Sequence, residues 1–271
     1  MSQQNEYGLQ SEFSTQQDQS TGWKNPSTVN TPSGASGEFL DPENLQPKNF
    51  SFNEESVRKG FIRKVYLILM GQLFFTFGVV SLFLFHKPTL EFTQHHPEIV
   101  LVACITTLVV VISMACCESA RRTFPVNFIC LGVFTLAESF LVGSIAGRYN
   151  SESVFLAIGI TAILCLALTI FAMQTKYDFT VCGGMLLAAM VCLLLFGIVG
   201  LFWRTHIMQT IYAGCGAMLA CIFLIYDTQI MMGGDHKYSI SPEEYIFAAL
   251  NLYMDVVRIF IYVLQLIGNK K

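Results

Sequence analysis

Charged side chains are scarce in this sequence. Asp, Glu, Lys and Arg make up 13% of its 271 residues, hydrophobic residues make up 53%, and the formal net charge is only −3. A typical soluble domain is about one quarter charged, so this composition excludes that class of protein. Lys and Arg form no long run, which argues against a nucleic-acid partner. The composition instead predicts an integral membrane protein embedded in a lipid bilayer.

Catalytic and metal-binding signatures are missing as well. The nine cysteines show no CxxC spacing and have no histidine ladder near them, so we expect neither a zinc site nor a disulfide framework. The HExxH and GxSxG motifs do not occur, and nothing in the sequence suggests a nucleotide or redox cofactor. We therefore expect a protein that is not an enzyme and has no catalytic residues and no cofactor.

The beginning of the chain is polar throughout. Gln, Ser, Thr, Asn, Pro and Gly dominate residues 1–50, and no apolar periodicity appears there. Such a segment buries too little apolar surface to offset the entropy that it would lose on ordering. It also lacks the basic start and the apolar core of a signal peptide. We expect a disordered tail.

Seven apolar stretches follow within residues 51–271. Each has about 20 residues or more, which is enough to cross a hydrocarbon core about 30 Å thick. The connections are short, so stretches that are neighbours in sequence should be antiparallel neighbours in space. The predicted fold class is an all-α integral membrane protein, a seven-helix transmembrane bundle with a disordered N-terminal tail. The expected spans are 65–85, 98–117, 126–147, 153–173, 179–202, 207–232 and 244–267.

The basic residues near the span ends predict the orientation. With the N-terminus in the cytosol, eight of these residues face the cytosol and five face the other side. This bias favours a cytosolic N-terminus, although Lys270 and Lys271 then lie on the opposite side. A last stretch that enters the membrane and returns would move both lysines to the cytosol. Six and seven full crossings therefore both stay open.

Two aspartates lie inside apolar stretches, Asp227 in CIFLIYDTQIMM and Asp255 in YIFAALNLYMDVVRIFIYVLQLIG. A carboxylate in hydrocarbon is costly unless it faces the bundle interior or a water-filled path. At the helical rise, Asp227 lies ~8 Å and Asp255 ~15 Å from the cytosolic ends of their spans, so a modest axial shift would bring them together. Two carboxyl groups in contact share a proton and titrate as a pair. Such a pair is a candidate pH-dependent latch, or a gate whose oxygens contact calcium transiently.

Further polar residues accompany this pair within the apolar stretches. Asn251, Asp255, Arg258 and Tyr262 follow each other at steps of four, three and four, which places them on one helix face that must turn into the bundle. An ion pair between Asp255 and Arg258 would give that aspartate a purely structural role instead. Glu138, in FTLAESFLVG, is a third intramembrane acid. It either lines the same path or is neutral and hydrogen-bonded.

Four motifs in the apolar part of the chain are distinctive: VRKGFIRKVYLILMGQL, ARRTFPVNF, IYDTQIMMGG and HKYSISPEEYIFAALNLYMDVV. Together they resemble the transmembrane Bax inhibitor motif family, in its lifeguard branch. The resemblance covers residues 57–267, which is nearly everything except the polar tail. The stretch from Tyr226 to Asp255 is its longest and most specific part.

The resemblance implies a seven-helix bundle in endoplasmic reticulum, Golgi or plasma membranes. Such a protein permits a pH-sensitive calcium leak, takes part in calcium homeostasis and protects cells from death signals. In bacterial relatives of this family, a latch of two aspartates lies between the sixth and seventh helices and is bonded to an arginine from the second. The aspartates match Asp227 and Asp255, and the arginine falls at Arg121 or Arg122. Similar sequences carry Asn where this chain has Arg258, a permanent cation that would hold Asp255 charged and shift or abolish proton gating.

Other functions stay open beside a calcium leak channel. A non-conducting anti-apoptotic regulator would act by binding death receptors or Bcl-type proteins, and the polar tail offers a surface for such partners. A remote alternative is an intramembrane aspartyl protease, because Tyr226-Asp227 resembles the first half of that signature. Its second half, GxGD, is absent, since the nearest match, MGGD at 232–235, has Met in place of the first glycine. A seven-helix receptor fits the number of spans but not the short loops or the cytosolic N-terminus.

Overall fold

The computed structural model describes residues 46–202, 205–233 and 236–270 of the chain. The predicted disordered tail, residues 1–50, lies almost wholly outside this part. The first described helix begins at Gln46, within the segment that we assigned to the tail. The helices are α1 (Gln46–Phe85), α2 (Lys87–His95), α3 (Pro97–Cys116), α4 (Glu118–Arg122), α5 (Val126–Ala146), α6 (Ser151–Gln174), η2 (Phe179–Cys182), α7 (Gly183–Phe202), α8 (His206–Met232), η3 (Pro242–Glu244) and α9 (Tyr245–Ile267).

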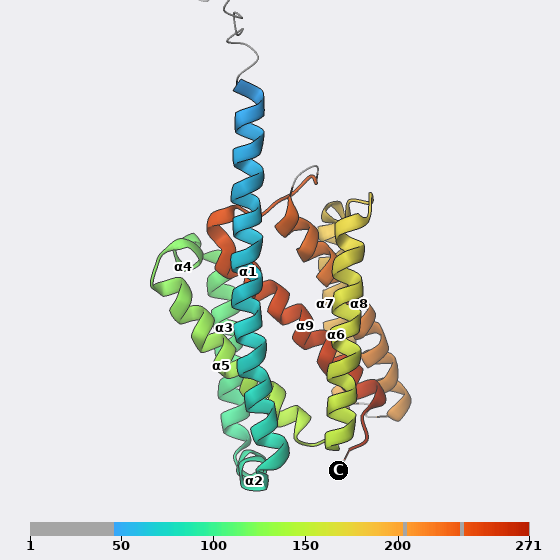
Figure 1. Ribbon diagram of the computed structural model, residues 1–271. Coiled ribbons are helices and arrows are strands. Elements are labelled where there is room, and N and C mark those ends of the chain that lie inside the picture. Colours follow the sequence, from blue (N-terminus) through green and yellow to red (C-terminus); the bar gives the residue numbers. More distant parts are fainter. Residues whose placement is uncertain (1–45, 203–204, 234–235, 271) are drawn as a thin grey trace, which may run out of the picture. The chain divides into compact units, whose positions relative to one another are not determined.

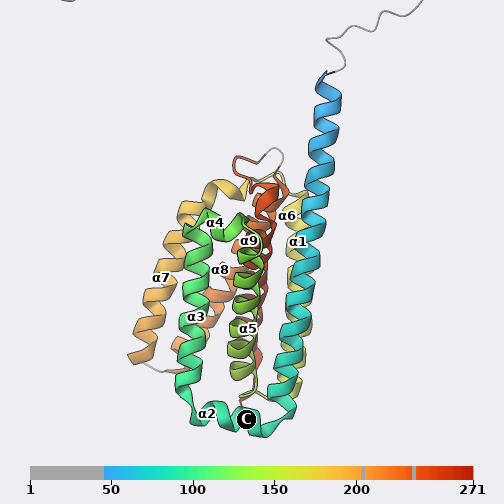
Figure 2. The same ribbon diagram turned by 90° about the vertical axis from the view of Figure 1, so that its left-hand side faces the viewer.

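Seven of the described helices are long and apolar enough to cross a membrane. This result confirms the predicted fold class of a seven-helix transmembrane bundle. The short helices α2 and α4 connect α1 to α3 and α3 to α5 at opposite ends of the bundle (Figure 2). The seven spans are Ser56–Phe85, Pro97–Cys116, Val126–Ala146, Ser151–Gln174, Phe179–Gly200, His206–Met232 and Pro242–Ile267.

The last span, α9, runs the full length of the bundle. It starts near α4, and the chain ends beside the connection between α5 and α6 (Figure 1). There Lys270 forms an antiparallel bridge with Tyr149, and the Asn150 N–H donates to the Asn269 carbonyl at 2.9 Å. A last stretch that enters the membrane and returns is therefore wrong, and seven full-length helices remain.

Helix α9 is also the centre of the bundle, where it packs against α8, α1, α6 and α5. Along its length Ile246, Leu250, Tyr253, Ile259 and Leu264 are fully buried. The peripheral helices α3 and α7 turn most of their apolar side chains outward, as lipid-facing helices do. Because lipid tails are as apolar as leucine, close packing and interhelical hydrogen bonds must hold such a bundle together.

Small residues bring α8 close to α9. Ala213, Gly216 and Ala220 are buried on one face of α8. A Cβ atom at Gly216 would lie only 2.4 Å from the ring of Tyr262 on α9. The absence of a side chain at this position therefore lets the two helices approach, and the same face leads on to Asp227.

A buried network of hydrogen bonds joins α1, α5 and α9 in the bundle interior. Gln72 on α1 donates from Nε2 to Thr135 Oγ1 on α5 at 2.8 Å. The hydroxyl of Thr76, one turn later, lies 2.9 Å from the hydroxyl of Ser139 and 2.8 Å from that of Tyr253. Interhelical hydrogen bonds of this kind stabilise membrane bundles by about 0.6–2 kcal/mol each. This network was not predicted from the sequence, because its partners lie on three different helices.

Candidate functional site

Asp227 on α8 and Asp255 on α9 meet inside the bundle. Their carboxyl groups are close enough to interact with each other. Asp255 is only 1% exposed, and its Oδ2 has no hydrogen-bond partner among the described residues. Two carboxylate oxygens can hydrogen-bond only if a proton lies between them. The geometry therefore suits a pair that holds one shared proton.

The packing of α8 explains how Asp227 reaches this position. Buried Ala213, Gly216, Ala220 and Leu224 precede it at steps of three, four, four and three, which keeps all five residues on one helix face. That face is turned towards α9. The sequence predicts different depths for the two aspartates. Close packing of this face of α8 against α9 brings them together.

Arg258 lies beside the pair, one turn further along α9. Its Nη1 is 3.8 Å from Asp255 Oδ1, and its side chain is 41% exposed. It lines a pocket of about 210 Å³ between α7, α8 and α9, together with Tyr212 and Tyr262. The intrahelical ion pair considered in the sequence analysis is thus present, with Arg258 placed between the aspartates and this pocket.

Glu138 on α5 faces the same region of the bundle. It is half-buried and close enough to Arg258 for the two charges to interact electrostatically. Its neighbour Ser139 belongs to the hydrogen-bond network with Thr76. Three acidic side chains and one arginine therefore share the middle of the bundle.

The expected arginine contact to the aspartates is wrong in this structure. Arg121 and Arg122 on α4 both point to Glu244, at the start of α9, with nitrogen–oxygen distances of 3.6 Å and 3.1 Å. Arg121 also lies 5.4 Å above the ring of Phe247. The reason is depth, because Asp255 follows Glu244 by eleven residues, or ~16 Å of helix. The two arginines hold the first turn of α9 instead.

Glu244→Gln is expected to destabilise the protein by about 1–3 kcal/mol, because it leaves the buried Arg121 nitrogen without a countercharge. Glu244 is 8% exposed as a residue, and Arg121 Nε is buried without a hydrogen bond within the described part of the chain. Thermal unfolding in detergent measures the effect. Glu243→Gln is the matched control, since that side chain is 74% exposed, and an equal loss in both variants would contradict the assignment.

The aspartates do not form a resident metal site by themselves. Among the described residues, no group of three or more His, Cys, Asp or Glu side chains could hold a metal ion. Calcium takes six to eight oxygen ligands, so two carboxyl groups provide a passing contact at most. The predicted role of Asp227 and Asp255 as a transient calcium contact stays a prediction.

Known proteins resemble most of this chain in sequence. A family described as "Inhibitor of apoptosis-promoting Bax1" matches residues 58–271. Protein lifeguard 3 of Mus musculus is 38% identical over 223 residues, covering 81% of this chain and 72% of its own length, and that of Homo sapiens is 39% identical over 223 residues, covering 81% and 71%. Protein lifeguard 4 of Mus musculus is 35% identical over 217 residues, covering 79% and 88%.

Proposed function

Because the chain belongs to the Bax inhibitor family, in its lifeguard branch, we propose that it is a pH-sensitive calcium leak channel gated by Asp227 and Asp255. Family membership makes it a multi-pass membrane protein of a kind connected with cell death. The leak would link calcium homeostasis to that process. The proximity of the Asp227 carboxyl group to that of the buried Asp255, inside a membrane-spanning bundle, is the observation that carries this proposal.

Protonation of the pair would act as the switch. With one shared proton, a hydrogen bond joins Asp227 to Asp255 and holds α8 against α9. With the proton lost, two negative charges repel each other at close range and attract a divalent cation. An ion that leaves the pair towards the C-terminal end of α9 would pass Arg258 and Tyr262, which line the pocket beside it.

Location and partners are part of the same proposal. The positive-inside bias supports a cytosolic N-terminus. The membranes of the endoplasmic reticulum or Golgi, or the plasma membrane, are the location that the resemblance to the family implies. Calcium would be the permeant or regulatory ion. The first 50 residues, which precede the bundle, would be the segment that meets Bcl-type proteins or death receptors.

Calcium efflux from proteoliposomes tests the channel proposal. Wild-type efflux should change as the pH is moved from mildly acidic to mildly alkaline values. Asp227→Asn and Asp255→Asn should each lose that change, because an amide cannot exchange a proton in this range. Glu152→Gln, at an exposed acid on α6, is the control and should behave like wild type. Efflux that does not change with pH and is the same in wild type and in both aspartate variants would overturn the proposal.

One observation favours the alternative of a non-conducting regulator. Arg258 already places a permanent positive charge 3.8 Å from Asp255. This cation could neutralise the pair and leave it as a structural anchor, so that the protein would act by binding other proteins. The two functions separate when cells carry the Asp227→Asn variant. Protection from death signals that persists without any calcium leak would support the regulator.

A further inference from the structure

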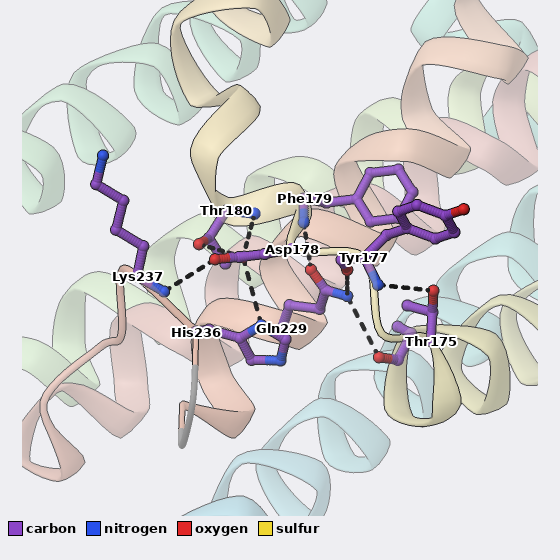
Figure 3. Close-up of polar contacts among 9 residues, drawn as sticks. Thr175, Tyr177, Asp178, Phe179, Thr180, Gln229, His236 and Lys237 are labelled. Atoms are coloured by element: carbon purple, nitrogen blue, oxygen red, sulfur yellow. Dashed lines mark hydrogen bonds and ion pairs between the residues drawn. The ribbon is translucent and has the colours of Figure 1, made fainter.

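A fully buried glutamine lies two residues after Asp227 on α8. Gln229 bonds to the segment between α6 and α7 (Figure 3). Its Oε1 accepts from the Phe179 N–H at 2.8 Å, and its Nε2 donates to the carbonyl of Tyr177 at 2.9 Å and to that of Ala172 at 3.5 Å. One side chain therefore ties the end of α8 to the end of α6 and to the start of η2.

The neighbouring Asp178 ties the same segment to the chain that follows α8 (Figure 3). One of its oxygens accepts from the Thr180 hydroxyl at 2.6 Å and the Thr180 N–H at 3.0 Å, and the other accepts from the Lys237 N–H at 3.0 Å. His236 Nδ1 lies 3.3 Å from Asp178 Oδ1, the oxygen that accepts both bonds from Thr180. The Thr180 hydroxyl first, then the Lys237 amide, lower the pKa of Asp178 to about 2. Its carboxylate is therefore charged at every pH at which a leak would be measured.

Arg58 on α1 holds the end of α8 from another side. Its Nη1 donates to the carbonyl of Met231 at 3.3 Å and to that of Ile240 at 2.8 Å. A cation at a helix C-terminus also complements the helix dipole. Gly233, at φ +60°, has room for this arginine only because it lacks a Cβ atom, which would lie 2.6 Å from the guanidinium.

We propose that Arg58, Asp178 and Gln229 form a clamp that positions Asp227 against Asp255. Asp227 lies within about one helical turn of Gln229 and Met231, so a shift at the clamped end of α8 moves its carboxyl group as well. The start of α9 is held separately by Arg122 through Glu244. Both helices of the pair are thus fixed close to the same end of the bundle. The three residues are positioning residues, and none of them touches the ion.

Two experiments test the inference. The second, calcium efflux, rests on the proposed leak, whereas the first does not require the protein to leak. The first test is hydrogen exchange of the full-length protein in nanodiscs. Gln229→Leu and Asp178→Asn should speed the exchange of backbone amides in 224–232 about tenfold and should also speed exchange around Asp255 on α9. Gln174→Leu, at an exposed glutamine of α6, is the matched control, and Asp178→Glu should restore slow exchange. Faster exchange confined to the segment between α6 and η2 and to the segment between α8 and η3 would overturn the positioning role.

The second test is calcium efflux as a function of pH. Gln229→Leu removes no titratable group, and the Asp178 carboxylate does not change its charge in the range studied, so neither residue is itself the group whose titration shapes the pH profile. Both variants should nevertheless change it, because the aspartate pair is displaced. Added to Asp227→Asn, they should have no further effect on the profile. His236→Gln is measured alongside as the control for the side chain that lies 3.3 Å from Asp178.

The two tests separate failure of the inference from failure of the proposed function. A wild-type protein that never leaks calcium, with exchange around Asp255 that still responds to Gln229→Leu, would remove the channel and keep the clamp. A wild-type leak whose pH profile is unchanged in both clamp variants would remove the clamp and keep the channel. Asp178→Asn keeps the size of the side chain, so it provides a folded variant where Gln229→Leu is poorly folded.

Discussion

Arg258→Asn is expected to raise calcium efflux about tenfold, which corresponds to about 1.4 kcal/mol in the barrier. In the wild type the guanidinium lies 3.8 Å from Asp255 and lines the pocket between α7, α8 and α9. A permanent cation there repels a divalent cation that reaches the pair, and this repulsion is strong where water is scarce. Asn removes the charge and keeps a polar side chain. The initial rate of efflux from proteoliposomes measures the change.

Arg258→Lys is the matched control for charge, because lysine keeps the positive charge and loses the planar guanidinium. It should leak at nearly the wild-type rate. Equal efflux from wild type and Arg258→Asn would contradict a pathway beside Arg258. A silent wild type with a conducting Asn variant would show instead that this arginine holds the natural protein shut, which is the behaviour of the alternative regulator.

Gly216→Ala is expected to destabilise the bundle by about 1–3 kcal/mol, the usual cost of overpacking a well-packed contact. Its Cβ atom would lie 2.4 Å from the ring of Tyr262, so either the ring or the whole of α8 must move away from α9. The expected result is a lower unfolding temperature in detergent. Weaker contact between Asp227 and Asp255 should follow, because the same helix face carries the aspartate.

Gly214→Ala is the matched control for the helix itself. A Cβ atom at Gly214 would meet nothing within 4 Å, and alanine favours a helix over glycine by about 1 kcal/mol. This variant should be as stable as the wild type or more stable. A loss of stability in Gly214→Ala equal to that in Gly216→Ala would mean that the small-residue face of α8 does not determine the approach to α9.

The spans were predictable because their signal is local and long. An apolar run of about 20 residues has few alternatives to a membrane helix, and the expected third span, 126–147, differs from the observed Val126–Ala146 by one residue. The proximity of Asp227 to Asp255 could also be predicted from the sequence. Both lie on helices joined by a short connection, and the small residues on α8 point along the face that carries Asp227.

The contacts between distant segments could not be predicted. Gln229 lies in a mostly apolar stretch, and nothing near it in the sequence indicates a partner fifty residues away at the start of η2. The resemblance to a family suggested that Arg121 or Arg122 would bond to the aspartates. In the structure α4 lies at the level of Glu244, so both arginines lie next to Glu244 instead. Such pairings depend on how far one helix is shifted along its axis relative to another. The sequence pattern of a single helix gives no information about that shift.

The most direct test of the gate is a double-mutant cycle at the aspartate pair. Calcium efflux and its pH profile are measured for wild type, Asp227→Asn, Asp255→Asn and the variant that carries both substitutions. If the two carboxyl groups share one proton, each single substitution already destroys the shared unit, and the double variant should match the single variants. Effects of the two substitutions that simply add, or a pH response that survives in the double variant, would contradict the gate.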